Sequence, residues 1–196
     1  MEQSNEVMEQ NTNKTFENSS KKSREKFLIE IFLWILLFIL CAVVVPKYVI
    51  QRAMVTGSSM ENTLFDGEQL LLDKISYRIG EPKRFDVVVF YPQIDDPEEH
   101  FVKRVIGLPG ETIQIIGSEI YINGKVLEEQ YGKDPIQYAG IAVEPITLGE
   151  DEYFLMGDNR TVSYDSRREE IGPVHKEAID GKAILRIWPL NKFGTF

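Results

Sequence analysis

The chain has 196 residues, enough for one domain with a substantial apolar core and short appendages. Its net charge is −9, and residues 47–196 alone carry 25 acidic and 17 basic side chains. This acidic balance argues against nucleic acid as a partner, because phosphate neutralisation needs clustered basic residues. One cysteine and two histidines argue against a disulfide framework and a zinc site, and no cofactor is predicted.

The first predicted segment, residues 1–26, lies before any apolar run. Residues 1–20 are rich in Glu, Asn, Gln and Ser and show no apolar period, so we expect them to be disordered. A basic cluster follows, made of Lys21, Lys22, Arg24 and Lys26.

The second segment, residues 27–46, is predicted to be a transmembrane anchor. From Phe27 to Val45 there are 19 residues with one charge, Glu30. A helix of that length spans about 28 Å, close to the ~30 Å hydrocarbon core of a bilayer. A buried core helix and a cleavable secretory signal are the alternatives, but the run is not amphipathic and no small-x-small pair closes it. The basic cluster predicts a cytoplasmic N-terminus, with residues 47–196 on the outer face of the cell membrane.

The third segment, residues 47–196, is predicted to be a mainly β domain of antiparallel sheets. Asn123-Gly124 between two apolar runs predicts a two-residue hairpin, and no helical pattern of useful length follows Val49. Gln93–Glu99 and Gly132–Gly149 are expected to be looser surface segments. Six runs rich in β-branched and aromatic residues are the predicted strands: Leu70–Leu72, Asp86–Tyr91, Phe101–Ile106, Thr112–Ile116, Tyr153–Met156 and Ala183–Trp188.

A candidate nucleophile lies in Gly57-Ser58-Ser59-Met60, between two predicted strands. A nucleophilic serine needs a sharp turn that presents its hydroxyl and a backbone N–H that stabilises the oxyanion. Gly57 permits such a turn. An ordinary surface loop is the alternative, and the residues themselves do not separate Ser58 from Ser59.

A candidate base is Lys103, inside an apolar run. Alternation along a strand puts Phe101, Lys103 and Val105 on one face. Apolar neighbours desolvate an ammonium and so lower its pKa. For Lys103 to act as a base near pH 7, its pKa must fall from ~10.4 to about 7, which costs on the order of 4 kcal/mol. Ser-Lys pairs are a recognised variant of Ser-His chemistry. The alternatives are a lysine that reaches solvent from an edge strand, and His100, in an acidic loop, as the base.

Gly157 to Arg167 follows a predicted strand and is dense in hydrogen-bonding groups. One interpretation is a buried polar network that holds a base in place, since a neutral lysine needs a directional partner such as a hydroxyl. The other is a solvated loop with a local salt bridge.

Taken together, these segments make the chain resemble the type I signal peptidases of bacteria, membrane-bound Ser-Lys endopeptidases that remove signal peptides from exported proteins. The family's motif Ser-Met-x-Pro-Thr-Leu matches Ser59 to Leu64, which selects Ser59 over Ser58. The lysine motif matches Lys103 to Gly110, and Gly-Asp-Asn-Arg-x-x-Ser-x-Asp-Ser-Arg matches Gly157 to Arg167. Asp86 to Phe90 is a weaker match. The compact chain with one predicted span looks like the Gram-positive form.

The resemblance implies that Ser59 attacks the scissile carbonyl while neutral Lys103 takes its proton. It implies that Ser163 orients Lys103, and that three further residues give structural support: Asp158, Asp165 and Arg167. The implied partners are the lipid bilayer and signal-peptide-bearing preproteins, bound as an added β-strand with small residues at the first and third positions before the cut.

Three positions depart from the family pattern. Asn62 stands where proline is usual, which predicts a less rigid turn after the nucleophile. Phe85 stands where glycine is frequent. Gly57 offers no hydroxyl where some relatives use a serine in the oxyanion hole, so the second donor is unassigned.

The alternative functions are a self-cleaving Ser-Lys peptidase of the repressor type and a catalytically silent, membrane-tethered β domain that binds exported proteins.

Overall fold

The computed structural model describes residue 24, residues 26–92 and residues 100–196. The predictions for residues 1–20, for Lys21 and Lys22, and for Gln93–Glu99 lie outside the described residues. The chain divides into two units, Met1–Lys47 and Tyr48–Phe196.

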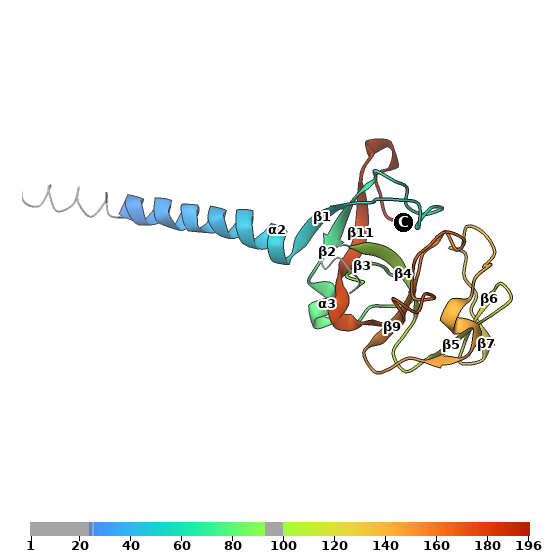
Figure 1. Ribbon diagram of the computed structural model, residues 1–196. Coiled ribbons are helices and arrows are strands. Elements are labelled where there is room, and N and C mark those ends of the chain that lie inside the picture. The colour runs from blue at the N-terminus through green and yellow to red at the C-terminus, as the bar shows by residue number, and fades with distance from the viewer. Residues whose placement is uncertain (1–23, 25, 93–99) are drawn as a thin grey trace, which may run out of the picture. The chain divides into compact units, whose positions relative to one another are not determined.

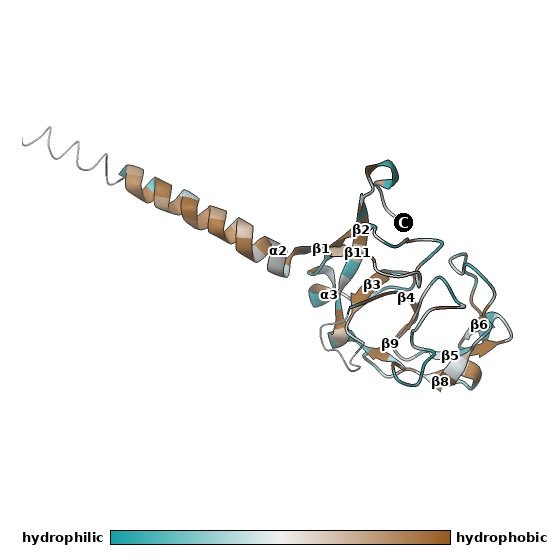
Figure 2. Cartoon of the chain, turned by 45° about the horizontal axis from the view of Figure 1, so that its top comes forward, coloured by the Kyte–Doolittle hydropathy of each residue, from teal (hydrophilic) through white to brown (hydrophobic). Residues whose placement is uncertain are grey.

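The first unit is helical where it is described. Residues 26–39 form an α-helix, Leu40–Val44 continue it as a π-helical turn, and Val45–Tyr48 form α2. The stretch Lys26–Val43 is long and apolar enough to cross a membrane, judged by length and composition. Figure 2 shows this helix as hydrophobic along most of its length.

The second unit contains two antiparallel sheets (Figure 1). The larger has the order β1-β2-β11-β3-β4-β9-β10 and the smaller the order β7-β6-β5-β8. The prediction of a mainly β, antiparallel domain is confirmed. The strands are β1 (Ile50–Met54), β2 (Gln69–Asp73), β3 (Val87–Phe90), β4 (Phe101–Gly107), β5 (Thr112–Ile116), β6 (Glu119–Ile122), β7 (Lys125–Val126), β8 (Ile146–Thr147), β9 (Glu152–Met156), β10 (Val174–His175) and β11 (Ile179–Trp188).

Local turn chemistry explains the hairpin between β6 and β7. Asn123 and Gly124 have φ values of +51° and +75°, the left-handed pair that a two-residue hairpin requires. In the described residues after β1 the helices are short, as expected: α3 covers Ser76–Ile79, and three 3₁₀ turns cover Gly140–Val143, Lys176–Ala178 and Leu190–Lys192. The expectation for Gly132–Gly149 was wrong in part, because this stretch contains the first of these 3₁₀ turns and β8, which pairs with β5.

Apolar clusters cover both faces of β4, the strand that carries Lys103. Ile106 belongs to a cluster shared with the smaller sheet, while Val105 belongs to a second cluster with Phe90 and Leu155. A third cluster contains Val55, Met60 and Leu64, from the segment around Ser59. The core therefore surrounds the place where the segment after β1 meets β4.

Candidate active site

Ser59 lies on the connection between β1 and β2. Gly57 has a φ of +86°, so the backbone makes the predicted sharp turn there, and Gly57 N donates to Asp66 Oδ1 at 2.8 Å. Asn159 holds the turn from a distant part of the chain. Its backbone N donates to Ser59 O at 3.0 Å, and its side-chain Nδ2 donates to Ser58 O at 3.1 Å.

Lys103, the third residue of β4, meets Ser59 from the sheet. Lys103 Nζ is hydrogen-bonded to Ser59 Oγ at 3.0 Å and donates to Val102 O at 3.1 Å. Nζ also lies 4.9 Å from the centre of the Phe101 ring, as the predicted shared face requires. Lys103 is only 3% exposed, and burial disfavours an ammonium relative to a neutral amine. β4 lies between β3 and β9, so the alternative of a solvent-reaching edge lysine is wrong.

Arg104, on the opposite face of β4, forms a buried ion pair with Asp158. The β4–β9 register pairs Arg104 with Met156, which brings Asp158 close. Arg104 Nε donates to Asp158 Oδ1 at 2.9 Å and Nη2 donates to Oδ2 at 2.7 Å. Thr63 Oγ1 donates to Asp158 Oδ2 at 2.5 Å and accepts from Arg104 Nη2 at 3.1 Å. Asp158 therefore links the strand of Lys103 to the connection that carries Ser59.

Asp165 and Arg167 form a second buried pair. Arg167 Nε and Nη2 donate to the two carboxylate oxygens of Asp165, each at 2.8 Å. Gly157 N donates to Asp165 Oδ2 at 3.0 Å, and Arg167 Nη1 donates to Arg160 O at 2.8 Å. This salt bridge joins residues two positions apart, as the solvated-loop interpretation predicted. Both side chains are buried, however, so the interpretation of Gly157 to Arg167 as a solvated loop is wrong.

Ser163 is buried beside the backbone of Ser59. A Cβ added at Gly157 would overlap both Ser163 Oγ and the carbonyl oxygen of Ser59, so these groups pack closely. Ser163 Oγ has no hydrogen-bond partner within the described part of the chain, and its predicted bond to Lys103 is not among the hydrogen bonds of the structure. An orienting role for Ser163 stays a prediction.

Three residues that surround this site were not predicted from the sequence: Thr63, Arg104 and Tyr131. The guanidinium carbon of Arg104 lies 3.7 Å from the centre of the Tyr131 ring, which also packs on Phe85 at 5.1 Å. The one available signal was a charged residue, Arg104, within an apolar strand. The local sequence around Tyr131 contains no pattern that predicts the packing of its ring on Arg104.

His100 is exposed, and its ring packs on Tyr91 at 4.2 Å, whereas the hydrogen bond to Ser59 Oγ comes from Lys103. Phe85 has a φ of +70°, a region that is strained for a bulky residue and explains why glycine suits this position. The Phe85 carbonyl accepts from Arg104 Nη1 at 2.8 Å.

A buried lysine hydrogen-bonded to a serine on a tight turn, in a mainly β domain, has the geometry of a Ser-Lys hydrolase. The family model described as signal peptidase, peptidase S26, matches residues 28–188. The chain belongs to this family of peptidases.

Named relatives match most of this chain. It is 36% identical to signal peptidase I T of Bacillus subtilis (strain 168) over 191 residues, which cover 94% of this chain and 96% of that protein. It is 38% identical to signal peptidase I of Leptolyngbya laminosa over 164 residues, covering 81% and 78% of the two chains. A crystal structure of a signal peptidase I from Enterococcus faecalis V583 matches with a TM-score of 0.40 and 32% identity, covering 52% of this chain and 95% of that chain.

Proposed function

We propose that this chain is a membrane-bound signal peptidase I, a serine endopeptidase that cleaves signal peptides from exported preproteins with Ser59 and Lys103. The observation that carries the proposal is the 3.0 Å hydrogen bond between Lys103 Nζ and Ser59 Oγ, with the lysine only 3% exposed. Relatives that match most of the chain bear the name signal peptidase I, which supports the same activity.

In the acylation step, neutral Lys103 takes the hydroxyl proton while Ser59 Oγ attacks the scissile carbonyl carbon. The carbon–nitrogen bond then breaks, and Lys103 Nζ delivers the proton to the leaving amine. Water hydrolyses the resulting ester with Lys103 again as the base. The carbonyl of Val102 accepts one N–H of the amine and so helps to aim its lone pair at the serine. The Ser59 N–H serves as one oxyanion donor.

The substrate would be an extended segment of a preprotein, added as a β-strand beside the site, with small residues at the first and third positions before the cut. Ser163, Asp158, Asp165 and Arg167 act as supporting residues. Two buried ion pairs suit this role, since a preorganised site needs side chains that are locked by neighbours.

The helix would anchor the enzyme in the cell membrane, with residues 1–26 in the cytoplasm and residues 47–196 on the outer face. Protease added outside protoplasts should then digest residues 47–196 and spare an epitope placed at the N-terminus. Digestion of that epitope in intact protoplasts would reverse the orientation.

Cleavage of a preprotein by the full-length protein in detergent tests the proposal. Ser59→Ala and Lys103→Ala should each abolish processing, because residues that act as a unit lose most activity singly. Lys103→Arg should fail too, since a guanidinium keeps its proton. Ser58→Ala is the matched control and should cleave normally.

The alternatives give different results in this assay. Near-normal turnover by Lys103→Ala would overturn the Ser-Lys assignment and make His100 the next base to test. Wild-type protein that binds the preprotein without cutting it would be the silent binding domain. Wild-type protein that cuts only its own chain would be a self-cleaving peptidase of the repressor type.

A further inference from the structure

Asn62, three residues after Ser59, has a backbone conformation that the family's usual proline cannot adopt. Its φ is +98°, whereas the pyrrolidine ring of proline holds φ near −65°. Thr63 N donates to Met60 O at 3.1 Å and closes a turn in which Asn62 is the third residue. A type II turn requires a positive φ at this position and favours glycine or asparagine there.

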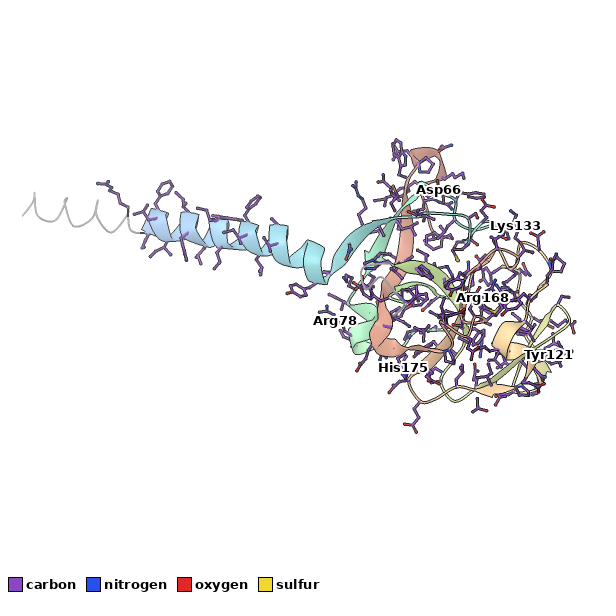
Figure 3. The ribbon with its side chains drawn as sticks, viewed as in Figure 1. Asp66, Arg78, Tyr121, Lys133, Arg168 and His175 are labelled. Carbon is purple, nitrogen blue, oxygen red and sulfur yellow. The ribbon has the colours of Figure 1, made fainter. Side chains whose placement is uncertain are left out.

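Two contacts attach the turn at Asn62 to the segment 131–133, and a third attaches that segment to Asp158. Asn62 Nδ2 donates to Tyr131 O at 3.3 Å, and the ammonium of Lys133 pairs with Glu61 at 2.8 Å. The backbone N of Lys133 donates to Asp158 O at 2.8 Å. Figure 3 shows Lys133 near the connection between β1 and β2. Asp158 also accepts from Thr63 Oγ1 of the turn, so the turn and this segment contact the same residue.

Residues of the candidate site lie on both sides of Asn62 in the chain, Ser59 before it and Thr63 after it. Ser59 precedes Met60, whose side chain is buried in an apolar cluster with Leu64. Thr63 follows Asn62 and donates from its hydroxyl to Asp158. A φ near −65° at Asn62 would redirect the chain between these two anchors, so Thr63 would leave Asp158 or Ser59 would move relative to Lys103.

We infer that Asn62 is a positioning residue whose left-handed backbone conformation sets the approach of Ser59 Oγ to Lys103 Nζ. In this chain, the proline of the family motif disrupts the site instead of rigidifying it. The inference rests on the proposed function, because its effect on rate is read from preprotein cleavage.

The test compares kcat and KM of Asn62 variants of the full-length protein in detergent. Asn62→Pro should lower kcat by roughly 100-fold or more with little change in KM, since small displacements of a catalytic group cost on this order. Asn62→Gly should stay within about threefold of wild type, because glycine adopts a positive φ freely. Asn62→Val keeps the N–H but disfavours a positive φ, and should fall between these two variants.

The matched control is Asn123→Pro, which places proline at another exposed asparagine with a positive φ, in the hairpin between β6 and β7. It should lower the Tm and leave kcat unchanged. Equal kcat in wild type and Asn62→Pro would overturn the inference. Equal kcat in the Asn62→Val and Asn62→Gly variants would also overturn it. An Asn62→Gly variant as slow as Asn62→Pro would overturn it too, because the loss of rate would then come from the lost hydrogen bond between the Asn62 side chain and Tyr131 O.

A second readout does not depend on activity. Amide hydrogen exchange at Thr63 and Leu64, which both donate to Met60 O, should be faster in Asn62→Pro than in wild type. Unchanged exchange would overturn the inference. A wild-type protein that cleaves no preprotein would instead reject the proposed function, and the exchange result would still decide whether Asn62 holds the turn.

Discussion

Replacing Asp158 with asparagine should lower the free energy of unfolding by about 3–5 kcal/mol, because this leaves a buried arginine without its counter-charge. The Asp158 carboxylate accepts two hydrogen bonds from Arg104 and one from Thr63, at 2.5–2.9 Å. The side chains of the ion pair are 0% and 2% exposed, so water cannot replace the lost partner. Asparagine keeps the shape but removes the charge and one acceptor oxygen.

This cost is large enough to measure by thermal unfolding of the full-length protein in detergent. In a domain of about 150 residues, each kcal/mol lowers the Tm by ~2–4 °C, so the expected fall is about 6–20 °C. The matched control is Glu61→Gln, which breaks the exposed pair with Lys133 and should cost less than ~1 kcal/mol. A Tm change for Asp158→Asn no larger than that of the control would refute the reasoning.

Three further predictions concern Lys103, Ser163 and acid stability. If neutral Lys103 is the base, a pH–rate profile should fall on the acidic side with a midpoint well below ~10.4; a midpoint near that value would mean a solvated lysine. Ser163→Ala should have a Tm near that of wild type but a turnover on the order of 100-fold slower. The control, Ser166→Ala, should have a lower Tm and an unchanged turnover, since Ser166 Oγ accepts a hydrogen bond from the buried Leu155 N. Burial raises the pKa of Asp86, but hydrogen bonds from Lys182, the Lys83 backbone and Tyr77 outweigh it and hold this pKa below 3.8. Its contribution to stability is therefore present above about pH 4 and lost as the pH falls through the lowered pKa, so urea unfolding of Asp86→Asn should show a smaller loss below pH ~4 than wild type.

Features that depend on near neighbours in the chain were predictable. The apolar run, the β-rich domain and the Asn123-Gly124 hairpin follow from hydropathy, periodicity and turn chemistry, which act over a few residues. The order of the motifs around Ser59, Lys103 and Gly157 was sufficient to indicate the family. Strands shorter than the recognisable patterns, such as β8 and β10, were missed because two residues carry no period.

By itself, the sequence determined the class of fold and the apolar helix, and it singled out Ser59 and Lys103 as the candidate reacting residues, because these features are carried by local patterns and residue types. Only the tertiary structure decided what surrounds them. Strand pairing put Lys103 in a central strand, where it is buried against Ser59. The same pairing brought Arg104 to Asp158, and the ring of Tyr131 lies on that guanidinium. These contacts join residues far apart in the chain, and no local pattern specifies which distant partner will fill the space beside a buried charge.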